Sequence, residues 1–300
     1  MKKILLIGKS GYVGNEFERY MKAFPDYEIT RISSRNGEWK KTNFMDYDVV
    51  YNVSGLSHGN AKRGTEDQYY EVNGKLPIDL AEKAKTEGVH HFIQMSSEIV
   101  YGDMAPLYVK KNITVDTIPD PPTVYGKSKM MSERGLEKLR SDDFKIAIMR
   151  PPLIYGERAP ENFHFLVRYA KKMPIFSNVP NNQSMIYIDN LCELIRLIID
   201  NQAEGIFYPQ EKNYMHTSKL VKDIAEASGH KMYLTKVFNP ALRLMQKRFR
   251  FVYKALGNLT YDYSMSEHFD GKYRVVGYQE SIRRIAKFQE RQGNREWKVQ

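Results

Sequence analysis

The sequence predicts an α/β protein with a doubly wound parallel sheet and a smaller, discontinuous lobe drawn from its C-terminal part. Through the N-terminal half of the chain, short β-rich runs alternate with stretches of helical periodicity, which is the pattern of successive βαβ units. A glycine-rich turn joins the first of these runs to the first helix. No linker rich in proline, serine or glycine divides the chain, so the lobe is expected to come from separate segments.

The composition is that of an ordinary globular protein from a reducing compartment. Its 300 residues suffice for one large or two smaller domains, and Cys192, the single cysteine, excludes an intramolecular disulfide. The apolar run from Ile4 to Ile7 is too short for a signal peptide and no stretch approaches a membrane span, so we expect a cytoplasmic protein. A net charge of +10 suits nucleic acid, an anionic membrane or phosphorylated small molecules. Zinc-ligand spacings, RNP-like motifs and basic repeats are absent from the sequence, so we expect no metal site and no nucleic-acid partner.

Five strands are expected in the N-terminal half, separated by helices or loops. The first, KILLIG, predicts a buried strand, and helical spacing follows it from Val13 until Pro25. A longer helical region runs from about Asp67 to Gly88, whose glycine suits a C-terminal cap, and another helix ends near Arg140. The strands are expected over residues 3–8, 27–33, 48–55, 91–97 and 145–156, the last running into a Pro/Gly loop.

The C-terminal half is more mixed. Residues 185–201 predict a short strand and a helix capped by Asp189 or Asn190, and residues 216–229 predict another capped helix closed by Gly229. We therefore expect a sheet domain over residues 1–155 with about 184–205, and a smaller lobe over about 156–183 and 206–300.

The first turn, with Gly8, Gly11 and Gly14, predicts a phosphate site. Glycines directly after a strand allow a tight turn and let backbone N–H groups approach a pyrophosphate at a helix N-terminus. The alternative is a glycine-rich surface turn, but the strand before it and the helix after it favour a dinucleotide. Further cofactor candidates from the same turn are Ser10, Tyr12 and Val13.

The end of the second strand bears on which dinucleotide is bound. An acidic residue about 20 positions after the glycine turn would bond a ribose 2′-hydroxyl and repel a 2′-phosphate. This chain has Ser33, Ser34 and Arg35 there, and hydroxyls with a guanidinium suit a phosphate. The stretch favours NADP slightly, with a solvated surface arginine as the alternative.

Two tyrosines have a lysine four residues later, and only one of these pairs lies in a helical pattern. Tyr125 and Lys129 would share a helix face, whereas Tyr208, four residues before Lys212, is followed by a proline at a strand-to-loop transition. A polar strand end with Ser97 lies 28 residues before Tyr125. Binding and catalytic residues of parallel sheets lie at the carboxyl ends of the strands. The first pair is therefore predicted to transfer a proton.

In combination, these motifs resemble the extended short-chain dehydrogenase/reductase superfamily, and within it the NAD-dependent epimerase/dehydratase family. The family's Ser-x-x-x-Tyr-Gly motif matches Ser97 ahead of Tyr101 and Gly102. The resemblance implies a Rossmann-like sheet that binds NAD or NADP, with Tyr125 transferring the proton and Ser97 bonding the substrate oxygen. Lys129 would hold the nicotinamide ribose and stabilise the phenolate.

Other segments match the same family. The stretch NVSG ends the third strand, MRPPLIYG resembles a segment that closes over nicotinamide, and MIYIDNL resembles a family signature. Asn73 matches a family asparagine in the long helix, with an ordinary polar helix residue as the alternative. The resemblance adds as cofactor candidates Ser54, Gly55, Asn73 and Pro152. The candidate substrate residues are His58, Ser97, Glu98, Arg158 and Tyr187, although a surface role for the loop histidine is as plausible.

Two departures from the family pattern affect the substrate and adenine ends. Gln183 and Ser184 stand where many relatives have an arginine for the substrate diphosphate, which leaves Arg158, Arg168 or Lys212 to compensate. The connection between the second and third strands is too short for the usual helix, so we expect a more open adenine side.

Residues 239–257 predict an amphipathic helix with a basic face. Apolar residues such as Leu242 and Val252 would lie on one side, and Arg243 and Lys254 on the other. Such a helix either covers the lobe with a solvated basic face, or contacts anionic lipid or a lipid-linked sugar diphosphate as a weak peripheral membrane contact.

The leading interpretation is a nucleotide-sugar 4-epimerase of the UDP-hexose type, acting through a transient 4-keto sugar, as in bacterial surface-polysaccharide synthesis. This interpretation favours NAD. One alternative is an NADPH-dependent keto-sugar reductase, which Ser33, Ser34 and Arg35 favour. A dehydratase of the same superfamily is less favoured, because this chain lacks the Asp that such an enzyme would have before Glu98. Another is a non-catalytic NAD(P)-sensing protein, against which the intact catalytic set argues. The resemblance also implies a homodimer.

Overall fold

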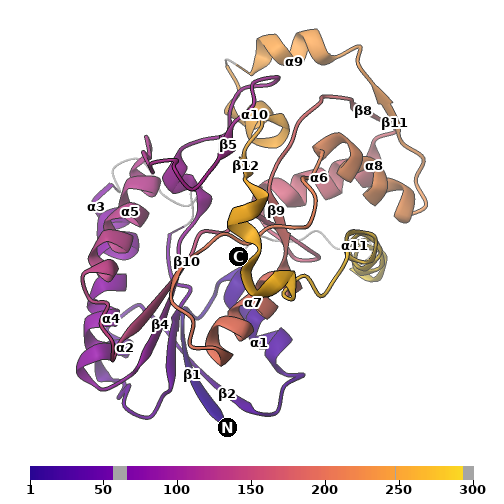
Figure 1. Cartoon of the computed structure of the whole chain (residues 1–300). Coiled ribbons are helices and arrows are strands. Elements are labelled where there is room, and N and C mark those ends of the chain that lie inside the picture. Colours follow the sequence, from indigo (N-terminus) through magenta and orange to yellow (C-terminus); the bar gives the residue numbers. More distant parts are fainter. Residues whose placement is uncertain (57–65, 247, 293–300) are drawn as a thin grey trace.

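The computed structural model describes residues 1–56, 66–246 and 248–292, and its centre is a six-stranded parallel sheet (Figure 1). The strand order is β10-β6-β4-β3-β1-β2, with every neighbouring pair parallel. The predicted α/β class is confirmed. The strands are β1 (Lys2–Ile7), β2 (Tyr27–Ile32), β3 (Val49–Asn52), β4 (His91–Met95), β6 (Lys145–Met149) and β10 (Gly205–Phe207).

Helices cover both faces of this sheet, which is why most residues of β1, β3 and β6 are buried and apolar. Side chains alternate along a strand, so Ile4 and Leu6 of β1 join the core under α1 and α7, while Leu5 and Ile7 join the core under α2, α4 and α5. All four side chains are fully buried. The helices are α1 (Tyr12–Met21), α2 (Glu38–Lys41), α4 (Leu76–Thr86), α5 (Val124–Glu137) and α7 (Ile188–Asp200).

The chain changes its direction of travel across the sheet at β1. This strand pairs with β2 on one side and with β3 on the other, so the connections after β1 and β3 lead toward opposite edges. In an open α/β sheet, ligands bind beyond the carboxyl ends of the strands at such a point. The connection from β2 to β3 does hold a helix, the four-residue α2, whose Trp39 is buried in the core. The expectation of no helix there is corrected.

The helix expected from about Asp67 to Gly88 is present in three parts. α3 (Glu66–Tyr69) passes into a π-helical turn (Tyr70–Lys75) and then into α4. Such turns are rare and occur frequently at functional sites. Gly74 packs the turn closely on α5, since a Cβ on it would lie 2.8 Å from the Met131 sulfur.

Most of the remaining elements lie beyond the carboxyl ends of the sheet strands (Figure 1). β5 follows β4 in the sequence but pairs with β12 near the C-terminus, so the segment that leaves β4 is built into this part. The boundaries of the two domains stay a prediction. The elements are β5 (Asn112–Ile113), β7 (Leu153–Tyr155), α6 (Glu161–Lys172), β8 (Ile175–Ser177), β9 (Met185–Tyr187), α8 (Thr217–Ala227), β11 (Tyr233–Thr235), α9 (Asn239–Met245), α10 (Arg250–Leu256), β12 (Thr260–Tyr261) and α11 (Tyr278–Gln292).

Two local expectations are wrong. α7 begins after Tyr187 without a side-chain cap, because Asp189 binds arginines and Asn190 binds the Val276 backbone. The single helix expected over 239–257 is split into α9 and α10, which turn away from each other (Figure 1). Across the described parts of the chain, no helix is both long and apolar enough to cross a membrane.

Candidate active site

The glycine turn after β1 depends on the backbone conformation of Gly8 and on the close approach of the end of β3. Gly8 has a φ of +132°, which favours glycine, and its N–H donates to the Ile32 carbonyl over 2.9 Å. A Cβ on Gly8 would lie 3.0 Å from Val53 Cγ2 and 3.1 Å from the Ser54 nitrogen, so β3 approaches closely here. A side chain at this position would separate the two strand ends.

Gly11 and Gly14 differ in the space around them. A Cβ on Gly14 would lie 2.9 Å from the Arg31 guanidinium, whereas no atom of the described residues lies within 4 Å of one on Gly11. Gly11 begins α1 with no side-chain cap and no acidic residue in the first turn. The Tyr12 and Val13 side chains pack against the core, and the N–H groups of this first turn lie at the positive end of the helix, where a helix provides them with no partner of its own. Ser10 is exposed.

Arg31 of β2 binds this turn and was missed by the sequence reasoning. Its Nε donates to the Gly8 carbonyl over 2.8 Å and its Nη1 to Asn15 Oδ1 over 2.6 Å. Its Nη2 is buried without a hydrogen-bond partner among the described residues. The signal was the one basic residue of β2, next to the buried Ile32 at the end of the strand.

A carboxylate stands at the end of β2, although Ser33, Ser34 and Arg35 contain none. The chain turns back through Asn36 and Gly37, both with positive φ, and brings Glu38 to the strand end. Glu38 Oε2 accepts the Ser33 N–H over 3.1 Å. The Ser33 hydroxyl in turn accepts the Arg35 N–H over 3.0 Å, and the Arg35 side chain is exposed. The Asn-Gly turn was the available signal.

A second part of the site, here called the corner, forms where β3 and β4 end beside α5. Asn73 of the π-helical turn accepts the Leu56 N–H over 2.8 Å and donates to the Leu56 carbonyl over 3.1 Å, which fixes the loop after β3. Lys129 Nζ donates to the Met95 carbonyl over 2.9 Å. A Cβ on Gly55 would lie 3.0 Å from Asn73 Oδ1 and 3.3 Å from Lys129 Nζ. Burial lowers the pKa of Lys129 to about 8, and nearby Glu133 opposes this.

Ser97 and Tyr125 approach this corner from two helix starts. Ser97 caps the short 3₁₀ turn after β4, and its Oγ accepts the Ile99 N–H over 3.3 Å. Tyr125 lies in the first turn of α5, half-buried, with its ring centroid 6.0 Å from that of Tyr69. A Cβ on Gly126, the next residue, would lie 3.1 Å from the Ile99 carbonyl oxygen. The two helix starts therefore press together.

A buried polar network lies beneath the corner and was not predicted. Glu133, one turn beyond Lys129 on α5, accepts Arg150 Nη2 over 2.6 Å and the Ser96 hydroxyl. Arg150 Nη1 also donates to the Tyr101 hydroxyl over 2.6 Å. The spacing of Glu133 from Lys129 on one helix face was the signal. The network joins β4, β6 and α5 below the candidate catalytic residues.

Glu98, beside Ser97, carries a buried carboxyl group. Burial raises its pKa to about 8, and Lys111 opposes the shift. The Lys111 ammonium itself donates to the Tyr101 carbonyl over 2.7 Å. The Glu98 N–H donates to the Pro151 carbonyl over 3.0 Å, which ties the turn to the segment after β6. At neutral pH the carboxyl is therefore mostly a neutral acid.

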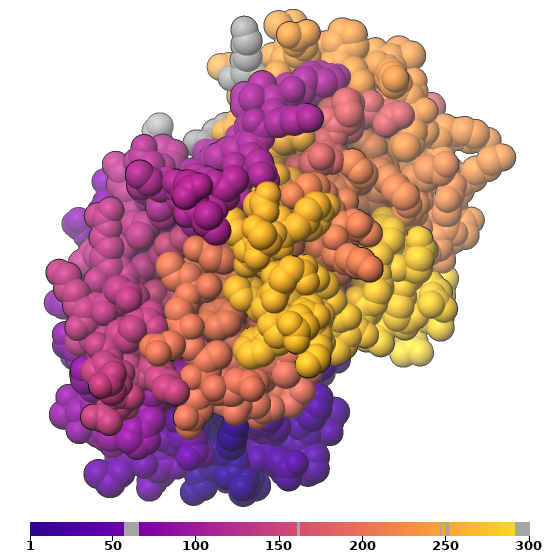
Figure 2. All heavy atoms as spheres, in the orientation of Figure 1, coloured from indigo at the N-terminus to yellow at the C-terminus, as the bar shows by residue number. Residues whose placement is uncertain are grey.

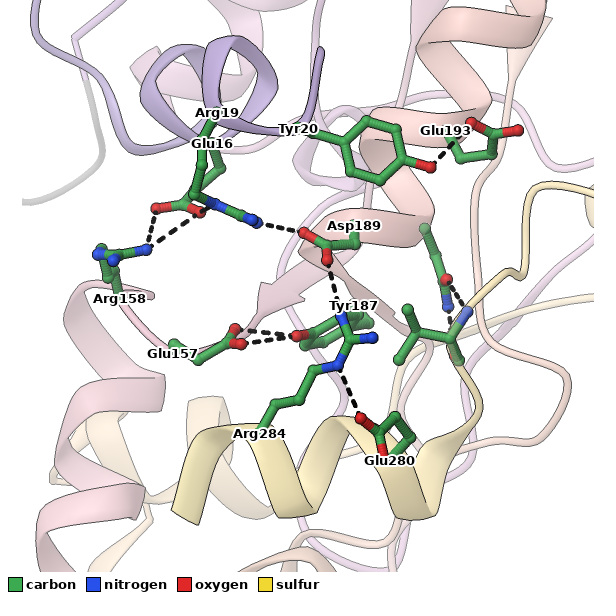
Figure 3. A network of polar contacts seen from close by, with 12 residues as sticks. Glu16, Arg19, Tyr20, Glu157, Arg158, Tyr187, Asp189, Glu193, Glu280 and Arg284 are labelled. Atoms are coloured by element: carbon green, nitrogen blue, oxygen red, sulfur yellow. Dashed lines mark hydrogen bonds and ion pairs between the residues drawn. The ribbon is translucent and has the colours of Figure 1, made fainter. Parts of the chain in front are cut away.

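Two predicted substrate residues, Arg158 and Tyr187, belong to a polar network that connects α1, the start of α7 and α11 (Figure 3). Arg158 Nη1 donates to Glu16 Oε1 over 3.1 Å, and its guanidinium carbon lies 4.9 Å from the Phe288 ring centroid. The fully buried Tyr187 hydroxyl donates to the Glu157 carboxylate over 2.9 Å. Either side chain would have to release these contacts before meeting a substrate.

The residues at the predicted diphosphate position are also engaged. Gln183 is buried and donates to the Gly257 carbonyl over 3.1 Å, and the buried Ser184 hydroxyl donates to Gln210 Oε1 over 2.6 Å. Arg168 and Lys212 are exposed.

The remaining candidates can be placed briefly. Pro152 is buried between β6 and β7. The Ser54 hydroxyl donates to Asn52 Oδ1 over 2.6 Å at the end of β3. His58 lies outside the described residues.

The residues present fit a nicotinamide dinucleotide. At one end, the space over Gly11 and the uncapped N-terminus of α1 suit a pyrophosphate, with the unpartnered Arg31 Nη2 buried beside the turn. At the other end, Asn73 and Lys129 hold the corner beyond β3 and β4. Together with the strand order, these features define a dinucleotide-binding protein with a Rossmann-type sheet.

Residues 4–208 match the model of the NAD dependent epimerase/dehydratase family. The chain therefore belongs to this family of enzymes, as its motifs indicated.

Curated relatives and solved structures extend this finding. UDP-glucose 4-epimerase of Vibrio cholerae is 28% identical over 255 residues, which cover 75% of this chain and 76% of that protein. N-acetyl-alpha-D-glucosaminyl-diphospho-ditrans,octacis-undecaprenol 4-epimerase of Escherichia coli O157:H7 is 26% identical over 251 residues, covering 76% of this chain and 73% of that protein.

Two solved structures share the fold. UDP-glucuronic acid 4-epimerase from Bacillus cereus, in complex with NAD, gives a TM-score of 0.71 at 16% identity, covering 95% of this chain and 98% of that one. Human epimerase family protein SDR39U1 with NADPH gives 0.75 at 13% identity, covering 95% and 99%.

Proposed function

We propose that the protein is a 4-epimerase of a hexose carried on a diphosphate, with a UDP-hexose as the first substrate to test. The main support is the placement of Ser97, Tyr125 and Lys129 around the carboxyl end of β4. The two curated relatives are named as 4-epimerases, one of UDP-glucose and one of a lipid-linked diphospho-sugar. Both carriers are therefore compatible with the proposal.

Tyr125 is the proposed acceptor of the proton from the sugar 4-hydroxyl. A tyrosine pKa lies near 10, so ionisation at neutral pH needs about 4 kcal/mol of differential stabilisation. The Lys129 ammonium, one turn away on the same helix, provides part of it because a nearby cation favours the phenolate. Ser97 accepts a bond from Ile99 and keeps its own proton to donate to the sugar oxygen. The glycine turn, Asn73 and Lys129 would hold a nicotinamide dinucleotide, which would supply reversible hydride transfer.

NAD is the proposed cofactor. The Glu38 carboxylate at the end of β2 would repel a 2′-phosphate and could accept a bond from a 2′-hydroxyl. The exposed Arg35 favours NADP instead, and for that reason an NADPH-dependent keto-sugar reductase is the second candidate function.

The first experiment is to denature the purified protein and identify any dinucleotide that it releases. Retained NAD supports an epimerase, because the cofactor is regenerated in each turnover. NADP, or an empty site that NADPH fills reversibly, supports the reductase, and Arg35→Ala should then weaken NADPH binding.

The second experiment measures the reaction itself. UDP-glucose and UDP-N-acetylglucosamine are incubated with the protein, and the 4-epimers are separated by chromatography. Formation of either epimer supports the proposal. Tightly held NAD without conversion of any UDP-hexose would contradict the UDP carrier and direct the assay to lipid-linked diphospho-sugars.

We further propose a cytoplasmic homodimer that joins through α4 and α5. On this side, Met131 of α5 and Ile118 of the preceding loop are 42% and 84% exposed, and a helix-pair interface would bury them. Light scattering should give twice the chain mass, and Met131→Glu should halve it. A monomer at all concentrations would contradict the dimer.

A further inference from the structure

The end of the molecule beyond the candidate active site (Figures 1 and 2) carries an exposed apolar band, here called the crest. It combines the loop after the catalytic strand end with α9 and the residues that flank α9. Each of its large apolar side chains is at least 43% exposed; they are Tyr108, Val109, Val237, Phe238, Leu244, Met245 and Phe249. Among the described residues, these are more than a third of all the exposed large apolar side chains. Apolar patches of this kind mark interaction sites.

The crest is held in place from below. α10 anchors it through Val252 and Leu256, which pack with Leu107 in a separate buried cluster. The Leu107 N–H donates to Gln246 Oε1 over 2.8 Å, so the loop is fixed beside the end of α9. α9 itself has no buried residue. Only Asn239 and Leu242 of α9 are half-buried, Leu242 against that cluster, and the other residues of the helix are exposed. A helix that is held mainly by its neighbours presents these exposed side chains to a partner.

The crest lies in the most basic stretch of the chain. Residues 227–261 contain seven lysines or arginines and no aspartate or glutamate, against a net charge of +10 for the whole protein. Lys236 and Arg243 line a groove at the crest together with Tyr108, Asn239, Pro240 and Leu244. Neither cation forms an ion pair within the part of the chain that the structure describes.

We propose that the crest docks the protein on an anionic phospholipid bilayer. Apolar side chains would enter the boundary between headgroups and acyl chains while Lys236 and Arg243 bind lipid phosphates. Interfacial helices bind membranes in this way, with one apolar and one basic face. A second copy of this chain would bring the same positive charge to the interface, and a nucleic acid would leave the apolar side chains unused. The docking is independent of the reaction that the site carries out.

The test is flotation of the full-length protein with vesicles of phosphatidylcholine, with and without phosphatidylglycerol. Binding should require phosphatidylglycerol and weaken as salt rises. Lys236→Gln with Arg243→Gln should weaken it about thirty-fold, from about a fivefold effect for each charge near the surface. Val237→Ser with Leu244→Ser should also release the protein.

Matched controls come from the amino end of the sheet. Lys22→Gln with Lys138→Gln, and Met45→Ser at a side chain that is 70% exposed, should leave vesicle binding unchanged. Thermal melts check that each variant is folded.

Three outcomes would overturn the proposal. They are no binding to phosphatidylglycerol vesicles at low salt, equal losses in the control variants, and self-association that Leu244→Ser abolishes without any vesicle binding. The last would assign the crest to a second copy of the chain.

Discussion

The carboxyl edge of the sheet and the crest differ in what each leaves exposed. At the edge, charged side chains are buried and bonded: Lys129, Glu133 and Arg150 are at most 4% exposed. At the crest, apolar side chains are exposed to solvent: Val237 is 77% exposed and Leu244 is 74% exposed. Proton transfer needs reacting groups fixed to within tenths of an ångström, and buried hydrogen bonds provide that. Docking on a fluid surface requires no such precision.

The comparison predicts its largest effect at Tyr125. Tyr125→Phe removes the proposed proton acceptor and should lower kcat by about a thousand-fold, while the dinucleotide released on denaturation stays unchanged. The control is Tyr208→Phe, the tyrosine of the other Tyr/Lys pair, which should lose less than about tenfold. If Tyr125→Phe kept a tenth of the activity, another group would have to be the base.

Glu133 tests whether the buried network supports the corner. Glu133→Gln leaves the Arg150 guanidinium buried without its carboxylate and should cost about 3–5 kcal/mol of stability by chemical unfolding. Glu137→Gln, one turn further along α5, removes an exposed partner of Arg140 and should cost less than about 1 kcal/mol.

The pH dependence of activity distinguishes a role of Glu133 in supporting Lys129 from a general loss of stability. Glu133 raises the pKa of Lys129, so Glu133→Gln should move the alkaline loss of activity to lower pH. Equal stabilities and superimposable pH profiles for the two variants would refute a supporting role for the network.

Glu98 gives a pH dependence of stability with a definite sign. Its pKa rises from 4.5 to about 8 on folding, so the folded protein holds a proton that the unfolded chain releases. Stability should therefore fall as pH rises between these values. Glu98→Gln cannot titrate, so its Tm relative to the wild type should increase from about pH 5 to about pH 8. A constant Tm difference would mean that the carboxyl is ionised in the folded protein.

Much of the carboxyl edge could be predicted because its signals are local. Turns such as Gly8-x-x-Gly11 and the Tyr125/Lys129 spacing need only a few consecutive residues in a known element. Glu38 was missed because an Asn-Gly turn folds it back onto β2, and a sequence does not show which way a turn leads. Arg31 was missed because its partners lie in another element.

The crest could be predicted only in part. The amphipathic pattern over 239–257 was recognised, but periodicity assumes that an apolar face is buried. The structure breaks the pattern between α9 and α10. It buries Val252 and Leu256 of α10, whereas Leu242 of α9 is only half-buried. Whether a helix packs depends on what the rest of the fold brings to it, and no local pattern contains that information.

The smallest predicted effect is on the free energy of unfolding at the crest. It tests directly whether the exposed side chains of α9 contribute to the stability of the fold. Leu244→Ala on α9 should change the free energy of unfolding by less than about 0.5 kcal/mol, because the side chain is already in water. Leu256→Ala on α10 deletes a side chain that is 5% exposed and should cost about 2–5 kcal/mol. Both are measured by urea unfolding at the same salt and pH. A cost at Leu244 close to that at Leu256 would show that α9 packs in solution, and the crest would then be part of the core instead of a docking surface.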